Sequence, residues 1–415
     1  MKINRVVVTG TGCVTPLGNN VHETWKGIKE KTIGYSKLEN LPESIQAKYF
    51  GLVKTDRKDF KKIPVHLRRA MPRFAKNAFL AAMEAVECAF STEKIQEYYN
   101  PFDCGVIIGT GWGGLDEAYD AHDQIKQLGI GHPLGSLETM PNIATATCSM
   151  YWNLRGYQNT MVAACATGNL AIGEAYQKIR YGDAKMMLAG GAEALNSNTN
   201  IWNVDILGAL SKEQNKAENA CCPFDIKRSG FILSEGAAVI CLEEYESATR
   251  RGAKILGEVI GYGSYSDARD FTAPAEDLEA RSRSIVHALQ DANLSPGDID
   301  YINAHGTSTP LNDLNETETI KKVFGKHAYD ISISSTKSYV GHLIAASGSF
   351  ETIVCLNAIN DSFIPATINL NDPDPKCDLN YTPNDHLQKE VNVALNLSFG
   401  FGGANAALIV RKMNL

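Results

Sequence analysis

The stretch that decides the fold is residues 161–194, MVAACATGNLAIGEAYQKIRYGDAKMMLAGGAEA. An apolar, strand-like run leads to Cys165, apolar residues recur at helical spacing over 169–182, and a second strand-like run covers 184–194. The cysteine would lie at the amino end of the helix, where the helix dipole and free N–H groups favour a thiolate and can hold an oxyanion. Taken alone, a cysteine between small residues is more often a small buried apolar side chain.

The same alternation of strands and helices continues on both sides of this stretch. It predicts an α/β layered protein. A seam near 250–256, where one helix ends and a new strand LGEVIGYG begins, divides the chain into two halves of similar content, as a duplicated fold would have. The other strand-like runs are RVVVTG (5–10), GVIIGTG (105–111), AAVICLEE (237–244), YINAHG (301–306) and ALIVRK (407–412). The first of these belongs to MKINRVVVTGTGCVTPLG (1–18), which we interpret as a first strand and turn.

Composition and net charge limit the kinds of partner and the cellular location that the sequence predicts. The net charge of −7 gives no overall attraction to nucleic acid. No apolar run approaches the ~18 residues of a membrane-spanning helix, and no signal-peptide core opens the chain. The ten cysteines have no zinc-type CxxC spacing, so reduced thiols in a cytoplasmic protein are the better interpretation.

Two further segments carry side chains that can do chemistry. YINAHGTSTPLND (301–313) places His305 at the end of a strand before a polar loop, and SISSTKSYVGHLIAASGSFE (332–351) brings Lys337 and His342 together. Each histidine alone could be a locally hydrogen-bonded residue. The sequence contains no HExxH, Walker A or GxSxG motif, and GTGCVTPLG (10–18) lacks the GxGxxG of a dinucleotide loop, so zinc, nucleotide and serine-hydrolase chemistry are not indicated and we predict no catalytic metal.

Together these segments resemble the β-ketoacyl-acyl carrier protein synthases of the elongating type. The ordered motifs are ACATG (164–168), NAHGTSTP (303–310), STKSxxGH (335–342) and SFGFGGAN (398–405), and the resemblance covers nearly the whole chain. It implies the duplicated five-layered α-β-α-β-α thiolase fold. One half would span residues 1–255 with Cys165, and the other residues 256–415 with His305, Lys337 and His342.

The resemblance also implies an activity, the decarboxylative Claisen condensation of an acyl-cysteine with malonyl on an acyl carrier protein. Cys165 would accept the acyl group, and the N–H groups of Cys165 and Phe401 would form the oxyanion hole, with Phe401 as a gate. His305 and His342 would donate to the enolate oxygen of the decarboxylated extender. Lys337 would tune both histidines.

Supporting residues follow from the same motifs. Glu351 would stabilise the histidine and lysine network from behind. Thr307 and Thr309 match residues that hold the pantetheine amides in this family. No cofactor is expected, apart from a monovalent cation that some family members bind, for which Asn303 and Glu351 are candidates.

An acidic carrier protein also needs a basic surface. The one basic cluster of this chain covers residues 57–76, RKDFKKIPVHLRRAMPRFAK, and charge alone fits a solvated helix face equally well. In relatives this region contributes to carrier docking, which favours Lys62, Arg68 and Arg69 as contacts. The resemblance further implies a homodimer, or a heterodimer with a subunit related to chain-length factors.

Several positions depart from the family pattern near the expected acyl pocket. Trp112 stands where long-chain synthases carry a smaller aliphatic residue, and Val204 and Asp205 replace a stretch that is usually rich in Phe and Gly. An indole in this space should shorten or reshape the acyl tunnel, because packed interiors do not absorb such volume freely. The substitutions favour a specialised chain, although drift at tolerant sites would explain each one singly.

Fatty acid synthesis and a type II polyketide or polyene pathway therefore both stay open. A non-catalytic chain-length partner or scaffold is a different class of function, but such relatives lack the nucleophilic cysteine that is present here. A non-decarboxylating thiolase would need a second catalytic cysteine near the carboxyl terminus, where this chain has GFGGANAALIV.

Overall fold

The computed structural model describes residues 3–92 and 94–413, and ten of its strands form one mixed sheet. The ten run in the order β11-β10-β14-β15-β9-β1-β8-β6-β4-β5. The strands are β1 (Val6–Val14), β2 (Ser36–Lys37), β3 (Tyr49–Gly51), β4 (Cys104–Gly109), β5 (Gln158–Asn159), β6 (Met186–Glu193), β7 (Leu233–Ser234), β8 (Gly236–Glu244), β9 (Gly257–Ser266), β10 (Tyr301–Asn303), β11 (Ser332–Ser334), β12 (Phe363–Ile364), β13 (Leu387–Gln388), β14 (Val393–Phe399) and β15 (Ala404–Arg411).

The sheet consists of two halves with the same topology. In the first, β5, β4 and β6 are parallel, and β8 and β1 follow antiparallel. In the second, β11, β10 and β14 are parallel, and β15 and β9 follow antiparallel. The halves join where β1 pairs with β9 antiparallel. The predicted α/β class and the duplicated thiolase fold are therefore confirmed, whereas the boundary at 255/256 stays a prediction.

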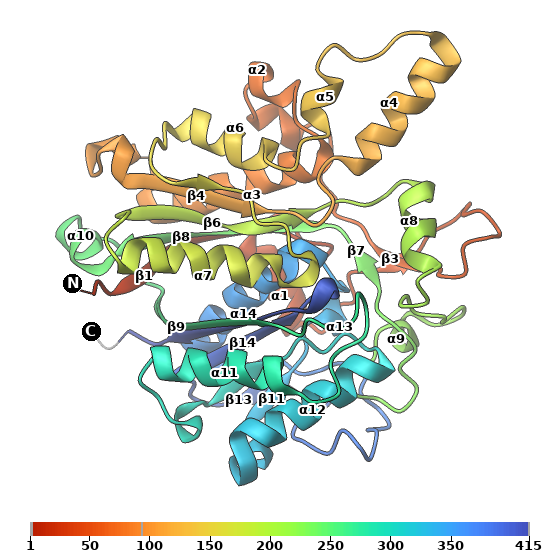
Figure 1. Ribbon diagram of the computed structural model, residues 1–415, viewed down its shortest axis with the longest axis vertical. Helices are drawn as coiled ribbons and strands as arrows, with labels where there is room; N and C mark the ends of the chain where they lie inside the picture. Colours follow the sequence, from red (N-terminus) through yellow and green to blue (C-terminus); the bar gives the residue numbers. More distant parts are fainter. Residues whose placement is uncertain (1–2, 93, 414–415) are drawn as a thin grey trace.

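Helices cover both outer faces and fill the space between the two halves of the sheet. Figure 1 shows α3 and α6 above the first half, α7 and α14 between the halves, and α11 and α12 below the second, which gives five layers. The helices are α1 (Val21–Lys29), α2 (Val65–Arg68), α3 (Arg73–Phe90), α4 (Leu115–Leu128), α5 (Gly135–Glu138), α6 (Ile143–Trp152), α7 (Thr167–Arg180), α8 (Asn198–Asp205), α9 (Ala217–Ala220), α10 (Tyr245–Arg250), α11 (Glu279–Asp291), α12 (Pro310–Phe324), α13 (Lys337–Val340) and α14 (Ser347–Asp361).

The amino-terminal segment forms the predicted strand and turn. The strand β1 continues to Val14, and Thr15 and Gly18 then exchange backbone hydrogen bonds at 2.8 and 3.2 Å across the turn. A Cβ on Gly12 would lie 2.0 Å from the Ala81 carbonyl oxygen of α3, so this glycine is needed for close helix–sheet packing. The apolar run before Cys165, in contrast, is not the predicted strand, since the short β5 ends at Asn159.

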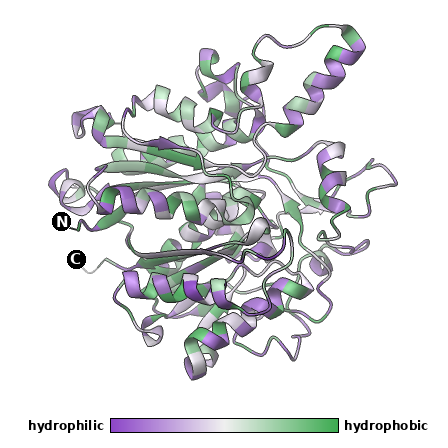
Figure 2. Cartoon of the chain, viewed as in Figure 1, coloured by the Kyte–Doolittle hydropathy of each residue, from purple (hydrophilic) through white to green (hydrophobic). Residues whose placement is uncertain are grey.

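The core is distributed over the layers as the duplicated sheet requires. One apolar cluster lies between the sheet halves around α7 and α14, a second lies under α3, and a third lies under α11. Figure 2 shows hydrophobic residues along the strands and hydrophilic residues on the outward sides of the outer helices. The middle layer is thus enclosed by protein on both sides, and functional groups at the ends of its helices are shielded from water.

The two middle helices begin in the same way. A short 3-10 turn, Ala164–Ala166, leads into α7, and a second, Ile344–Ala346, leads into α14. The first residue of each turn has a positive φ, +46° at Ala164 and +48° at Ile344. The next residue of the turn is Cys165 in the first half of the chain and Ala345 in the second. Both residues are buried.

Candidate active site

Cys165 lies on the sharp turn that opens α7 and lines a cavity of about 400 Å³. Its side chain is 5% exposed. The backbone at Ala164 adopts a left-handed conformation that non-glycine residues rarely take, and such strained positions cluster at functional sites. The turn therefore presents the thiol to the cavity and buries the rest of the residue.

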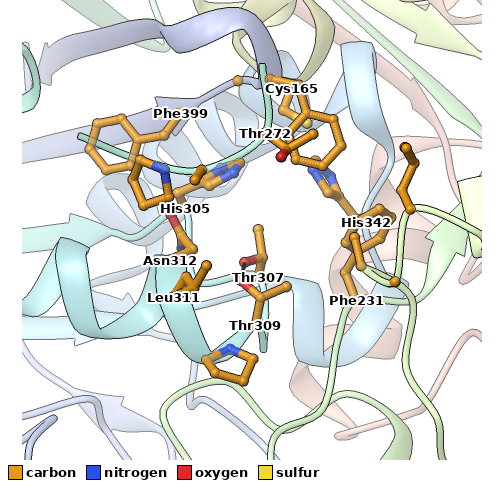
Figure 3. A pocket seen from close by; sticks show the side chains of 18 of the residues that line it. Cys165, Phe231, Thr272, His305, Thr307, Thr309, Leu311, Asn312, His342 and Phe399 are labelled. Carbon is orange, nitrogen blue, oxygen red and sulfur yellow. Dashed lines mark hydrogen bonds between the residues drawn. The ribbon is translucent and has the colours of Figure 1, made fainter. Parts of the chain in front are cut away.

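Two histidines from the second half of the chain face this thiol. The Cys165 sulfur and one nitrogen each from His305 and His342 lie within 4.8 Å of one another. His305 follows β10, and His342 comes just before the turn into α14. Figure 3 shows Cys165, His305 and His342 on three sides of the same cavity. The structure thus brings together the three residues that the sequence predicted as reactive.

The hydrogen bonds of His342 fix its tautomer. The Ile344 N–H group donates to Nδ1 at 3.2 Å, so Nδ1 is an acceptor and the neutral ring carries its hydrogen on Nε2. Nε2 is buried and has no hydrogen-bond partner among the described residues. Burial and the Lys337 charge lower the pKa of His342 well below its usual value, so the ring is neutral at physiological pH. A metal ion on Nε2 would displace this hydrogen, and the tautomer therefore favours donation over ligation.

His305 is held through its backbone. The His305 and Gly306 N–H groups donate to the two carboxylate oxygens of Glu316, at 2.7 and 2.8 Å. The imidazole Nδ1 is buried without a partner. Burial, followed by the charges of Lys337 and the neighbouring His342, lowers the pKa of His305 well below its usual value. Two neutral imidazoles with unpaired nitrogens therefore face one thiol.

Lys337 does not line the cavity. It forms a buried ion pair with Glu351, and both side chains are 1% exposed. Burial raises the pKa of Glu351, while the neighbouring ammonium opposes this rise. The predicted tuning and supporting residues are thus in contact, and the positive charge acts on the histidines from behind the cavity wall.

The protonation state of Cys165 differs from the sequence prediction, in which the helix amino terminus favours a thiolate. Burial raises the pKa of Cys165 to about 12, and the Lys337 charge and the Phe401 N–H group lower it only in part. Desolvation therefore outweighs the helix terminus, and the resting residue is a neutral thiol.

Phe401 approaches the nucleophile from the end of β14. Its N–H group interacts with the Cys165 sulfur, and its side chain lines the cavity. This approach depends on Gly400, where a Cβ would lie 2.9 Å from the Ala163 oxygen and 3.3 Å from the Cys165 nitrogen. The donors predicted for the oxyanion hole therefore meet at the thiol.

Thr307 and Thr309 line the cavity on the side away from Cys165 (Figure 3). Their hydroxyl groups lie 2.8 Å apart. Hydroxyl groups can donate and accept, so this pair can bind amide groups of an extended ligand that reaches the thiol.

The three predicted acyl-pocket residues are placed differently from one another. Trp112 and Val204 belong to one apolar cluster that also holds Ile344 and Phe401, of which Phe401 lines the cavity. Asp205 does not join it, because its carboxylate accepts the N–H groups of Gln46 and Ala47, at 2.6 and 3.2 Å. Its side chain fixes a surface loop, which the residue pattern alone did not reveal.

The basic cluster does not form one helix face. It covers a short 3-10 helix (Asp59–Lys62), α2 and the start of α3. Lys62 and Arg69 are exposed, whereas Arg68 is half-buried and donates to the Phe60 carbonyl at 3.0 Å. None of the predicted docking residues lines the cavity.

Sequence reasoning missed several residues of the cavity wall. Their side chains carry no nucleophile and no histidine: Lys212, Phe231, Thr272, Arg281, Asn312 and Phe399. The Phe231 ring packs edge-on against His342 at 5.1 Å. Asn312 and Phe399 lie in the segments 301–313 and 398–405, whose motifs were the available signal for them.

Oxygen atoms suitable for a monovalent cation lie behind the site. Asn303 Oδ1 and Glu351 Oε2 are buried without partners. Both residues act on Cys355, whose thiol pKa is raised by burial and by the Glu351 charge and lowered by the Asn303 backbone. These hard oxygen donors fit an alkali cation. Separately, none of the helices in residues 3–92 and 94–413 has the length and apolar character needed to cross a membrane.

Family models match both halves of the chain. Residues 3–248 match the β-ketoacyl synthase N-terminal domain, and residues 256–371 match the corresponding C-terminal domain. A 3-oxoacyl-[acyl-carrier-protein] synthase 2 from a Synechocystis species is 40% identical, with 99% of each chain covered. A protein of the same description from Staphylococcus aureus is 39% identical, with 98% of each chain covered.

Solved structures of ketosynthases also align with nearly the whole chain. A chain from a type II polyketide synthase complex, in which an acyl carrier protein is bound to its ketosynthase with a hexaketide, aligns with a TM-score of 0.91 at 33% identity. A chain of the ishigamide ketosynthase/chain length factor aligns with a TM-score of 0.90 at 29% identity. Each alignment covers 99% of this chain and 100% of the other.

Proposed function

Because this chain belongs to the β-ketoacyl synthase family, we propose that it condenses an acyl group on Cys165 with malonyl on an acyl carrier protein. The observation that carries the proposal is the buried thiol facing two neutral imidazoles with unpaired nitrogens. Relatives described as 3-oxoacyl-[acyl-carrier-protein] synthases support the same reaction.

The first step is acyl transfer. The Cys165 sulfur attacks the thioester carbonyl of an acyl carrier, a new carbon–sulfur bond forms, and the carrier thiol leaves with the proton of Cys165. The N–H groups of Cys165 and Phe401 stabilise the oxyanion of the tetrahedral intermediate. The raised pKa of Cys165 fits a nucleophile that loses its proton only during the reaction.

The second step generates and uses a carbon nucleophile. The carbon–carbon bond to the malonyl carboxylate breaks, carbon dioxide leaves, and the electron pair remains as an enolate. His342 Nε2–H donates to the enolate oxygen, and His305 supplies the second contact. The enolate carbon attacks the acyl-Cys165 carbonyl and forms a carbon–carbon bond. The carbon–sulfur bond to Cys165 breaks, and the leaving thiolate takes up a proton from solvent, which restores the thiol.

The cavity also supports assignments around this reaction. Thr307 and Thr309 would hold the pantetheine arm, and Asn303 and Glu351 would hold a monovalent cation that organises the back of the site. Carrier docking would involve Lys62, Arg68 and Arg69 on the basic cluster. The ten free cysteines fit a cytoplasmic location.

We assign the substrate to a specialised chain, with an ordinary fatty acyl chain as the alternative. Trp112 and Val204 pack in one apolar cluster with Phe401, and an indole in this cluster would shorten or reshape an acyl tunnel that passes Phe401. The polyketide ketosynthase structures support this assignment, and the fatty acid synthase relatives support the alternative.

Mass spectrometry of the protein incubated with different acyl carriers tests both the activity and the chain. We expect a thioester adduct on Cys165 with short or unsaturated chains and little adduct with medium and long saturated chains. A Cys165→Ala variant is the control and should form no adduct. Adduct formation in this variant would overturn the nucleophile assignment, and efficient elongation of long saturated chains would remove the specialised assignment.

A further inference from the structure

A buried arginine in the cavity wall has no role in the reaction described above. Arg281 lies on α11, is 6% exposed and lines the cavity together with His305. A buried guanidinium ordinarily has a carboxylate partner, because an isolated buried charge is costly. Within the described part of the chain, no carboxylate oxygen lies within ion-pair distance of Arg281, and its Nε has no partner.

The nearest carboxylates are occupied by other donors. Glu316, Asp267 and Asp313 act electrostatically on Arg281, whose pKa burial lowers to about 10. Glu316 accepts the His305 and Gly306 N–H groups, Asp267 accepts the Asn405 amide at 2.7 Å, and Asp313 accepts the Phe224 N–H group at 2.9 Å. The Arg281 guanidinium therefore remains cationic near neutral pH, and its other contacts must explain why a charged group is buried in the cavity wall.

Its direct contacts lead to His305 along two routes. The first runs through hydrogen bonds. Arg281 Nη1 donates to Asn312 Oδ1 at 3.1 Å, and the Asn312 amide donates to Glu316 Oε2 at 3.3 Å. Glu316 in turn accepts the His305 and Gly306 N–H groups. Arg281 therefore orients Asn312 so that its amide faces the carboxylate that holds the His305 backbone.

The second route runs through an aromatic ring. The Arg281 guanidinium carbon lies 4.1 Å from the centroid of the Phe399 ring, which is the geometry of a cation–π contact. The same ring also packs against His305, with centroids 5.8 Å apart and planes inclined by 69°. Figure 3 shows Phe399, His305 and Asn312 on one wall of the cavity. The arginine therefore limits where the imidazole can move.

We propose that Arg281 is a positioning residue for His305, holding its backbone through Asn312 and Glu316 and its imidazole through Phe399. The inference rests on the proposed role of His305 at the enolate. A guanidinium suits this task because its planar fork can donate to Asn312 while its face lies on Phe399, whereas an ammonium can do only one of these well. Displacement of a reacting group by about 1 Å can cost about 100-fold in rate.

The test separates the two steps of the reaction. In an Arg281→Met variant, we expect acylation of Cys165 to stay within about twofold and carbon dioxide release from malonyl carrier to fall at least about tenfold, mainly in kcat. Arg281→Lys should recover part of the loss. Arg283→Met is the matched control, since Arg283 lies on the same helix, is 65% exposed and contacts only Glu279 among the residues described.

A spectroscopic readout keeps the test independent of turnover. The imidazole ¹H–¹⁵N signals of His305 should shift in Arg281→Met and in Asn312→Ala, which breaks the same route from its other end, and stay unchanged in Arg283→Met. Equal losses in both steps, or unmoved His305 signals, would overturn the proposal. Wild-type protein that releases no carbon dioxide would instead refute the enolate role of His305, and the imidazole signals would still decide the positioning role.

Discussion

At the scale of single residues, burial and one buried positive charge set the protonation of the site. Burial lowers the pKa of both histidines and raises that of Cys165. The charge of Lys337, which is paired with Glu351, lowers the pKa of both histidines further and opposes the rise in the pKa of Cys165. The histidines stay neutral donors and the thiol stays protonated until a substrate arrives. The motifs predicted which residues meet, but not this balance, because desolvation depends on burial that only the fold supplies.

Replacing Lys337 by Met should therefore slow alkylation of Cys165 by iodoacetamide. The pKa of this thiol already lies above its ordinary value, so the thiolate fraction is small at neutral pH and rises about tenfold per pH unit. Removing the ammonium raises the pKa further, and we expect an alkylation rate about tenfold lower at each pH below 10. Peptide mass spectrometry, which distinguishes Cys165 from the exposed Cys88, measures the rate.

Glu351→Gln is the matched control for this charge. It retains the ammonium and removes its negative partner, so the alkylation rate should stay equal or increase. An unchanged rate in Lys337→Met would show that the lysine field does not reach the thiol.

At the scale of elements, the reactive groups are positioned where β14 ends against the turn that opens α7. The sequence motifs located Cys165 and Phe401 at this contact, and the helical spacing after Cys165 predicted α7 well. The expected strand before Cys165 is absent, because residues 160–163 run beside β4 with a single backbone bond, from Thr110 to Met161, rather than a ladder. Apolar character alone cannot distinguish such a buried extended segment from a strand.

Adding one methyl group at this contact should disable the site without unfolding the protein. In a Gly400→Ala variant, the new Cβ would lie 2.9 Å from the Ala163 oxygen and 3.0 Å from the Ala166 nitrogen, so β14 and the turn must separate. We expect acylation of Cys165 to fall about 100-fold, as when an oxyanion donor is lost, while the urea midpoint shifts little. Gly297→Ala, whose Cβ has only Ser295 nearby, is the control. Retained acylation in Gly400→Ala would exclude the proposed oxyanion hole.

At the scale of the whole molecule, the ten-stranded sheet ends at β11 on one side and at β5 on the other. Exposed apolar side chains follow β5 in the sequence or lie on α4 and α6: Ile125 (56%), Leu128 (66%), Met150 (61%), Tyr151 (44%) and Val162 (55%). Strand edges without a neighbour and exposed apolar side chains are features of subunit interfaces. The resemblance predicts a homodimer, or a heterodimer with a chain-length-factor-like subunit, and we expect this surface to contribute to the contact in either case.

A charge on this surface should separate the subunits. We expect wild-type protein to elute as a dimer in size-exclusion chromatography with light scattering, and Met150→Glu to shift towards monomer. Tyr329→Glu, an equally accessible aromatic position in the second half of the chain, should leave the dimer intact. A wild-type protein that is monomeric alone and associates only with a second, cysteine-lacking chain would favour the heterodimer.

The paired turns before α7 and α14 have a consequence for how this enzyme can change over time. Two equivalent backbone sites face each other across the internal symmetry axis, and only one carries a nucleophile. The other site carries Ala345, which has no reactive group, and the two imidazoles come from the same second half of the chain. Neither half retains a complete set of reacting groups, so a recombination event that exchanged one half between related genes would succeed only if the incoming half matched the resident one at this axis. Selection should therefore preserve the two halves as a single inherited unit.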